Sequence, residues 1–498
     1  MTSPTPGSAP ELPARPRTQP DSMQGTRYVY GVEPLAGDDV WAMFEAATEG
    51  DEAAARRLLQ HDPRLVNAQC CYQLPLHRAV AGGHVGLVAL LLEQGADPGQ
   101  SRYTFHSWDK LLTTARANGQ REIESLLVRA MEWRFQYSPH FDHLRQAIIA
   151  RNPLQVEAVV RDQPELVRSS DALGNSALHW SVITRQLSLL RRFVEWGTPI
   201  DPLRADGHTP VLLAASGATD YWYRETRGPA HPSLRNPAVL VGSLLTLGAE
   251  YTLSVAAAMG DLERVEQLLG HDPGLATQLD SARVSPLSRA AKGGYLHIVR
   301  LLLDRGADPN RPEECAPEGR ALFEACCGNH REVAELLLQR GANPNAEVDS
   351  CECCLTIAAV YHGDRAQPLQ QLLRDYGAWL PPYRMDAPQL KQALREQTPA
   401  VGHAEFLRCV IQHCDAELLT LLLESDPTAV SRLEVGDELT QLQDPVLLER
   451  LLDRGLDPTR PDWLGHTLLD ACREQPGHPL PRLFENRRRG SPPPATPR

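Results

Sequence analysis

A short helix-pair signature, SPLSRAAKGGYLHIVRLLLDRGADPN at residues 285–310, constrains this fold more than any other feature. Ser285 is suited to cap a helix and Pro286 to occupy its first turn, so we expect one short helix to begin here. Two glycines end that helix, and apolar residues at helical spacing predict a second one that ends at Gly306 in a left-handed cap. Pro309 prevents its resumption. Helices this short cannot bury their apolar stripe alone, so further copies must stack on them.

Copies of this signature recur along most of the chain. Gly95 follows Leu74 by 21 positions, as Gly306 follows Ser285. The first positions of the units fall at residues 41, 74, 110, 142, 176, 209, 251, 285, 320, 353 and 405, and near 436 and 466. Most steps lie between 32 and 36 residues, which matches a repeat of roughly 33. Two longer steps, of 42 and 52 residues, mark insertions.

At this point the chain resembles the ankyrin-repeat family, over roughly residues 39–475. The family pattern begins T-P-L-H and ends G-A-D-x-N, and it survives here as Thr209-Pro210-Val211, Ser176-Ala177-Leu178-His179 and Gly341-Ala342-Asn343-Pro344-Asn345. The resemblance implies an all-α ankyrin-repeat solenoid of about 12–13 helix–turn–helix units. It also implies that first helices and hairpin tips line a concave face that binds proteins. His77 and His179, at the T-P-L-H histidine, would brace the turns between adjacent repeats.

The remaining segments divide around this array. We expect a disordered tail rich in Pro, Ser and Thr, a cap for the first repeat, the array itself and a disordered basic tail, at residues 1–26, 27–40, 41–486 and 487–498. The insertions fall near 218–237 and 379–404. The apolar spacing of Leu390 and Leu394 predicts an extra helix in the second one.

The composition argues against some classes of partner. A net charge of −13 argues against a nucleic acid held mainly through its phosphates. No apolar run approaches the roughly 18–20 residues of a membrane span, and the N-terminus lacks the apolar region of a secretory signal. We therefore expect a cytoplasmic protein, whose 11 cysteines remain thiols. A monomer that binds another protein, without nucleic acid, membrane or cofactor, fits these features best.

The insertion in unit six is aromatic. Gly248 lies 39 residues after Thr209, against 21 in the reference units, which leaves 18 extra residues between the two helices. They include Tyr221, Trp222, Tyr223 and Arg224. A disordered linker is rarely this apolar, so the loop either belongs to a binding site or shields the helix ends of units five to seven.

The concave face supplies the other candidate binding residues. First-helix positions expected to be exposed there are Arg78, Trp180, Leu213, Arg289 and Glu324. Trp180 is either an interface anchor, as aromatics often are, or packs on its neighbour in unit six. Trp108, in an aromatic stretch before the third unit, joins the candidates.

Two clusters could contribute to a metal site. His140-Phe141-Asp142-His143 places two imidazoles and a carboxylate within four residues, although the repeat register makes Asp142 a helix cap and His143 a surface residue. Cysteines also gather in units nine and ten, at Cys326-Cys327 and Cys351-x-Cys353-Cys354. In register Cys326 replaces a packed alanine, and Cys353 and Cys354 replace the Thr and Pro of the pattern. We expect packing residues, and we predict no metal ligand.

These observations favour a non-catalytic scaffold or adaptor. The sequence contains no phosphate-cradling glycine loop, GxSxG elbow or HExxH helix, and we predict no catalytic residue. The competing hypothesis is an enzyme or metal-binding protein whose site is assembled from inserted loops, chiefly His140, His143 and His231. Metal analysis combined with a pull-down would separate the two.

Overall fold

The computed structural model describes Gln19, Met23, Gly25, Arg27, Tyr28 and residues 35–490. Within that range, residues 70–72, 99–109, 217–236, 314–315, 347, 349–351, 403–405, 414, 427–428, 433–436 and 461–466 are not described. The chain falls into two compact units, one of residues 27–378 and one that contains residues 379–498. No helix in the described part is both long and apolar enough to cross a membrane.

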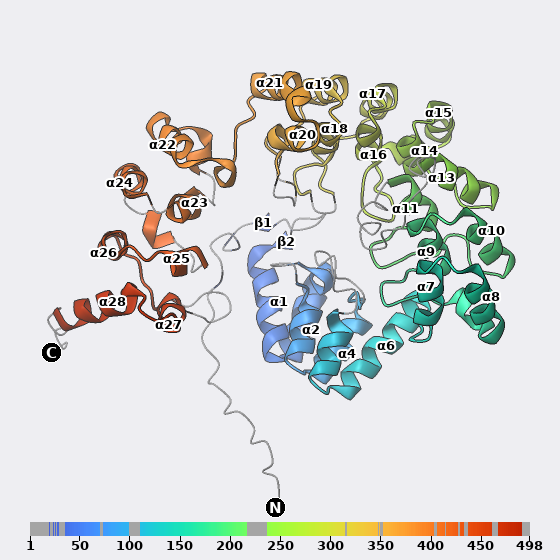
Figure 1. Ribbon diagram of the computed structural model, residues 1–498, viewed down its shortest axis with the longest axis horizontal. Coiled ribbons are helices and arrows are strands. Elements are labelled where there is room, and N and C mark those ends of the chain that lie inside the picture. Colours follow the sequence, from blue (N-terminus) through green and yellow to red (C-terminus); the bar gives the residue numbers. More distant parts are fainter. Residues whose placement is uncertain are drawn as a thin grey trace, which may run out of the picture. The chain divides into compact units, whose positions relative to one another are not determined.

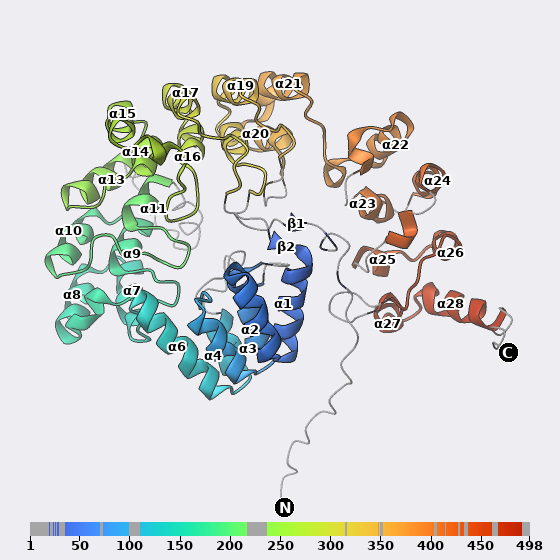
Figure 2. The same cartoon turned by 180° about the vertical axis from the view of Figure 1, so that it is seen from behind.

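Residues 27–378 form a row of stacked helix pairs (Figure 1). The first helices are α1 (Gly37–Glu49), α3 (Pro75–Ala81), α5 (Lys110–Ala117), α7 (Phe141–Ile149), α9 (Ala177–Ile183), α11 (Pro210–Ser216), α14 (Leu253–Met259), α16 (Pro286–Gly293), α18 (Ala321–Cys327) and α20 (Cys354–His362). The second helices are α2 (Glu52–His61), α4 (Val85–Glu93), α6 (Arg121–Phe135), α8 (Pro153–Asp162), α10 (Leu187–Glu195), α13 (Pro237–Thr246), α15 (Leu262–His271), α17 (Leu296–Asp304), α19 (Arg331–Gln339) and α21 (Gln367–Asp375). From α7 to α17, the first helices lie on the inner side of the curved row and the second helices on its outer side (Figures 1 and 2).

A small strand pair precedes the row. β1 (Arg27–Tyr28) pairs antiparallel with β2 (Leu35–Ala36), directly before α1. Helix α1 starts at Gly37, four residues before the position that the repeat spacing indicates. Asp38 and Asp39 in its first turn favour the earlier start, because carboxylates stabilise the positive end of a helix.

Side-chain caps start several first helices, including the one predicted at Ser285. The hydroxyl of Ser285 accepts a hydrogen bond from the Ser288 amide at 3.0 Å, and that of Thr252 accepts one from the Val255 amide at 3.3 Å. Each bond satisfies one of the amides that a helix N-terminus leaves without a backbone partner.

The predicted left-handed cap is present at Gly306, where φ is +89°. The Gly306 amide donates to the Leu303 carbonyl at 3.1 Å, and the Ala307 amide donates to the Leu302 carbonyl at 3.0 Å. This is the Schellman arrangement, which requires a positive φ at the glycine. Equivalent positive-φ glycines end other second helices, at Gly95, Gly197, Gly248, Gly341, Gly377 and Gly455. Helices α2, α8 and α15 instead lead into 3₁₀ turns at Pro63–Asn67, Pro164–Arg168 and Pro273–Thr277.

Asparagine side chains link successive units. The Asn67 amide donates to the Gly95 carbonyl at 3.0 Å, and the Asn345 amide donates to the Gly377 carbonyl at 3.1 Å. Between them, Asn310 makes the same bond to Gly341 at 2.7 Å. Each asparagine therefore satisfies a carbonyl at the end of the next unit's second helix.

His179 is the bracing residue that the resemblance implied. Its Nδ1 accepts a hydrogen bond from the Ser176 amide at 3.1 Å, and its Nε2 donates to the His208 carbonyl at 3.0 Å. Burial, followed by the charge of Arg204, lowers the pKa of His179 to about 3. His77 makes the same local bond, with its Nδ1 accepting a hydrogen bond from the Leu74 amide at 3.1 Å.

Residues 379–498 have a core of their own. Their described helices are α22 (Ala387–Glu396), α23 (Phe406–Gln412), α24 (Ala416–Ser425), α25 (Asp437–Gln441), α26 (Pro445–Asp453), α27 (Leu468–Arg473) and α28 (Pro479–Gly490). Helix α22 is the extra helix predicted for the second insertion, and its Leu390 and Leu394 are buried in this core. Helix α28 extends into the stretch expected to be a disordered tail, because Leu480 and Phe484 anchor it to the same core.

We predict that Gly306→Val lowers the free energy of unfolding by roughly 1–2 kcal/mol, because a β-branched residue is strained at positive φ. A side chain at Gly306 would meet no atom within 4 Å, so the backbone alone carries the cost. Gly270→Val is the matched control, since Gly270 lies exposed within α15 with similar open space and no positive φ. Urea denaturation followed by circular dichroism measures both, and equal stability of the two variants would contradict the assignment.

We also predict a pH dependence that arises from His179. Because its pKa is about 3 in the folded chain against an ordinary value of 6.5, the unfolded chain binds the extra proton first. Its contribution to stability is fully present above pH 6.5 and falls, by about 1 kcal/mol per pH unit, as the pH decreases toward 3. Urea denaturation at pH 6 and pH 5 should therefore show a smaller loss for His179→Gln than for the wild type. An identical loss in both proteins would refute this account.

Candidate functional site

The five inner-face residues predicted to be exposed share one structural position. Each is the fourth residue of its first helix, in α3, α9, α11, α16 and α18: Arg78, Trp180, Leu213, Arg289 and Glu324. The repeat register was therefore correct. The expected exposure was wrong for three of them, since Trp180, Leu213 and Arg289 are only 3%, 0% and 7% exposed.

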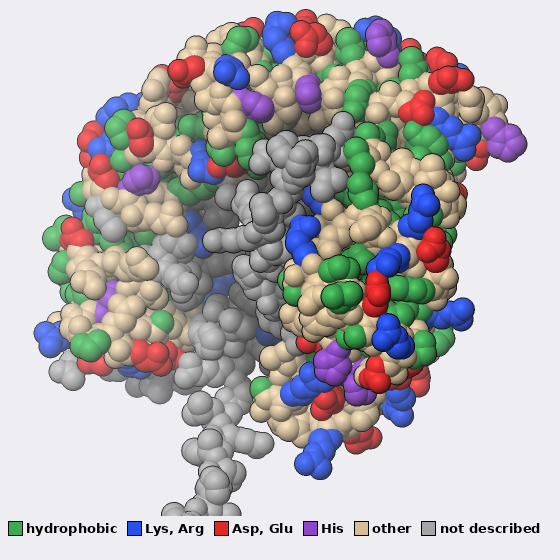
Figure 3. All heavy atoms as spheres, turned by 45° about the vertical axis from the view of Figure 1, so that its right-hand side comes forward, with side chains coloured by type: hydrophobic (Ala, Val, Ile, Leu, Met, Phe, Trp, Pro, Cys, Tyr) green, Lys and Arg blue, Asp and Glu red, His purple; other side chains and the backbone are tan. Residues whose placement is uncertain are grey.

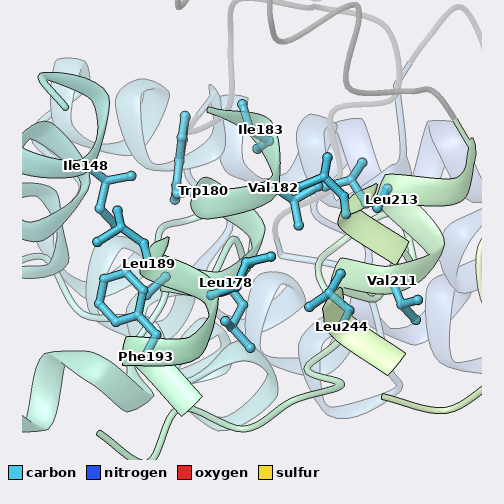
Figure 4. Packing of buried hydrophobic residues seen from close by; sticks show 14 of the residues in the cluster. Ile148, Leu178, Trp180, Val182, Ile183, Leu189, Phe193, Val211, Leu213 and Leu244 are labelled. Carbon is cyan, nitrogen blue, oxygen red and sulfur yellow. The ribbon is translucent and has the colours of Figure 1, made fainter. Parts of the chain in front are cut away.

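Trp180 is buried because it braces the hairpin ahead of its own helix. Its indole Nε1 donates to the Asp171 carboxylate at 2.9 Å, and the Arg145 guanidinium lies 5.5 Å from the ring centroid. The ring also belongs to the apolar cluster that contains Leu213 on the neighbouring helix (Figure 4). Burial raises the pKa of Asp171, although the indole and backbone amides donate hydrogen bonds to its carboxylate.

Arg289 makes the same brace with a different side chain. Its Nε donates to Asp280 at 3.0 Å, and this carboxylate lies nine residues before it, as Asp171 lies nine residues before Trp180. A guanidinium and a carboxylate that are both buried must be paired, which keeps Arg289 from facing solvent. An acidic residue nine positions ahead is a sequence signal that could have identified both braces.

Leu213 is buried for another reason. The position nine residues ahead of it is Arg204, which pairs with Asp206 at 2.7 Å and donates to the Asn175 side chain at 3.2 Å. Leu213 has no polar partner to reach and packs into the apolar cluster instead. The hairpin before α11 is thus held by its own ion pair and by the preceding hairpin.

The inner face is open at α16, α18 and α20. These are the first helices of three successive units. Their seventh residues are Lys292, Cys327 and Val360, and none of them is fully buried. Val360 is 59% exposed and its neighbour Tyr361 is 63% exposed. With Glu324, these four residues form what we call the α16–α20 surface: Lys292, Glu324, Cys327, Val360 and Tyr361.

Glu324 gives this surface a fixed negative charge. Its carboxylate lies 3.8 Å from the Lys292 ammonium and 3.3 Å from the Arg320 guanidinium. Burial alone would raise the pKa of Glu324, but the nearby positive charges, with Lys292 first, outweigh it and lower the pKa. The carboxylate therefore stays ionised at neutral pH, and the longer contact leaves the Lys292 ammonium, whose side chain is 48% exposed, open to solvent.

Several predicted binding residues lie outside the described residues. These are Trp108, Tyr221, Trp222, Tyr223 and Arg224, together with His231 of the competing hypothesis. Arg78 is described and is half-buried on α3.

The structure brings His140 and His143 near each other without a third ligand. Both are exposed, and their ring centroids are 6.4 Å apart. Asp142 is not the helix cap that the register indicated, because α7 already begins at Phe141, and its carboxylate pairs with Arg145. In the described ranges, no three His, Cys, Asp or Glu side chains lie close enough to hold a metal ion.

The described cysteines of units nine and ten occupy the packing positions predicted for them. Cys326 is fully buried in α18, Cys353 is the N-cap residue of α20, and Cys354 is its buried first residue. A hydrogen bond with the Cys354 thiol and burial raise the pKa of Cys326 well above its ordinary value. Burial also raises the pKa of Cys327, to about 12. The Cys326 and Cys327 thiols are therefore neutral at physiological pH, which disfavours both metal ligation and nucleophilic attack.

Cys472 and His478 lie as close together as a catalytic cysteine–histidine pair, but they do not have its charge state. The Cys472 sulfur lies 3.7 Å from His478 Nε2, and both side chains are buried. Burial raises the pKa of Cys472 to about 11 and lowers the pKa of His478. Both groups are therefore held in their neutral forms, the opposite of a thiolate–imidazolium pair.

Comparison with known proteins matches the repeats. A family model described as "Ankyrin repeats (many copies)" matches residues 43–106, and one described as "Ankyrin repeats (3 copies)" matches residues 253–348. A curated relative, the intracellular phospholipase A2 of Caenorhabditis elegans, is 46% identical over 59 residues, which are 12% of this chain and 6% of that protein. The chain therefore corresponds to only a small part of that relative.

A solved structure, the human ASB11 ankyrin repeat domain, is also similar to this chain. The match covers 49% of this chain and 99% of that domain, with 19% sequence identity and a TM-score of 0.27. The two family-model matches coincide with helix pairs that carry the Gly306-type cap and the asparagine links. The chain is an ankyrin-repeat protein.

Proposed function

We propose that this protein is a non-catalytic scaffold or adaptor that binds another protein on the inner side of its first helices. Ankyrin repeats are generally protein-interaction modules. The observation that carries the proposal is the α16–α20 surface, where two large apolar side chains, Val360 and Tyr361, are more than half exposed. Aromatic side chains such as Tyr361 are typical anchors of protein interfaces, and Val360 adds exposed apolar area beside it.

The α16–α20 surface combines exposed apolar side chains with charged ones. Val360 and Tyr361 offer area that a partner can remove from water, while the ionised Glu324 and the exposed Lys292 can orient polar groups. The Arg289–Asp280 brace fixes the hairpin before α16, the helix that carries Lys292. This brace limits motion at the α16 end of the surface, which reduces the entropy lost on binding.

The charge distribution supports a protein partner. On the face shown in Figure 3, the described acidic and basic side chains are interspersed with apolar ones. With a net charge of −13, such a surface suits a partner recognised by mixed contacts rather than by phosphate binding. We propose a monomer that works in the cytoplasm. Arg78 and Glu324 remain in the proposed contact face, whereas the buried Trp180, Leu213 and Arg289 do not.

The double variant Val360→Ser/Tyr361→Ser tests this surface. We expect at least a tenfold loss of partner capture, about 1.4 kcal/mol or more, because truncating a tyrosine that anchors an interface costs about 2 kcal/mol. The thermal transition should change little, since both side chains are already exposed. Quantitative pull-down with the purified chain as bait provides the measurement.

The matched control is Trp133→Ser/Leu154→Ser, which removes two side chains that are 85% and 76% exposed on α6 and α8. It should retain capture. Equal losses in the two double variants, or no loss in either, would contradict the proposed surface.

The aromatic loop of unit six is a second proposed contact. Changing Tyr221, Trp222 and Tyr223 together to Ser should reduce partner capture while the thermal transition stays the same, if the rings contact the partner. A lower transition temperature with capture retained per folded molecule would instead show that the loop only shields the array. Circular dichroism and the same pull-down measure the two quantities on one preparation.

A further inference from the structure

The connection before α14 lacks a hairpin. Residues 204–208 form a tight turn before α11, closed by a hydrogen bond from the Arg204 amide to the His208 carbonyl at 3.2 Å. Residues 280–284 form the corresponding turn before α16, closed by a hydrogen bond from the Asp280 amide to the Val284 carbonyl at 2.9 Å. We call them the α11 hairpin and the α16 hairpin. Between them, α13 ends at Thr246 and α14 begins at Leu253, which leaves no room for a hairpin at α14.

The two hairpins touch across this gap. Gly207, at the tip of the α11 hairpin, has φ +80°, and a Cβ at this position would lie 1.8 Å from the Ser281 carbonyl oxygen and 3.1 Å from the Ala282 Cα. These are backbone atoms, so they cannot move aside as a flexible side chain would. Only glycine fits at this contact.

The α16 hairpin is also packed into the core of the preceding units. Ala282 is 4% exposed and belongs to the apolar cluster that contains Leu213 of α11 and Val255 of α14. The Arg289–Asp280 ion pair then ties the α16 hairpin to α16 itself. A continuous path of contacts therefore runs from the α11 hairpin to α16 without passing through α14.

In a simple repeat array each unit contacts only its neighbours, and stability is a sum of unit and nearest-neighbour terms. The contact between the α11 and α16 hairpins joins units that are two apart. Opening α16 withdraws Ser281 and Ala282 from the α11 hairpin, and opening α11 removes the packing around Ala282. We infer that α11, α14 and α16 open as one cooperative block rather than helix pair by helix pair.

Native-state hydrogen exchange on the full chain, read by mass spectrometry, tests this inference. Gly207→Ala forces the two hairpins apart, and we expect protection to fall by roughly tenfold or more in α11, α14 and α16 together. Gly306→Ala is the matched control, because Gly306 has a similar positive φ and a Cβ there would meet no atom within 4 Å. Its effect should stay with α17 and the helices beside it. A loss of protection in α11 that leaves α16 unchanged would overturn the inference.

Ala282→Gly changes the α16 hairpin at the same contact. It therefore tests the inference even if the Gly207→Ala variant does not fold. It removes one buried methyl group, which corresponds to about a fourfold change in an opening equilibrium. Cooperative opening requires α11 to lose protection along with α16. If protection changes only in α16 and the helices in direct contact with it, the proposed cooperative opening of α11, α14 and α16 is refuted.

Discussion

Each helix pair of this protein depends on its neighbours to bury the apolar stripe that it cannot bury alone. First helices of seven to thirteen residues are too short to be stable in isolation, so the stacking interface supplies most of the folding free energy. Other features serve that interface. The left-handed glycine cap turns the chain at the end of a second helix such as α17, and the asparagine side chains join one cap to the next.

Two of the hairpins are held to the first helices by one recurring polar contact. A carboxylate in the hairpin and a donor nine residues later make one brace, which uses an indole at Trp180 and a guanidinium at Arg289. The two donors differ in charge and shape, yet they satisfy the same buried acceptor position. Where arginine replaces the carboxylate, at Arg204, the brace is lost and an apolar residue fills the space.

The sequence was sufficient for the periodic part of the fold, because the caps, the glycines and the apolar spacing act locally. The end of α17 at Gly306 and the extra helix at Leu390 follow from such patterns. Exposure was harder to predict, because it depends on contacts between segments that are distant in the pattern. Trp180 looked exposed in its own helix, but Asp171 and Arg145 come from the preceding hairpin and unit. The α16–α20 surface was only partly found, since the sequence does not reveal that Val360 stays uncovered.

The missing hairpin before α14 also constrains how this gene can change. Repeat arrays usually grow or shrink by duplicating or deleting whole units, because every junction resembles every other. Here, a unit inserted between α11 and α16 would separate Gly207 from Ser281, and a unit removed would press their backbones together. The number of units in this segment is therefore constrained by one close approach of two main chains.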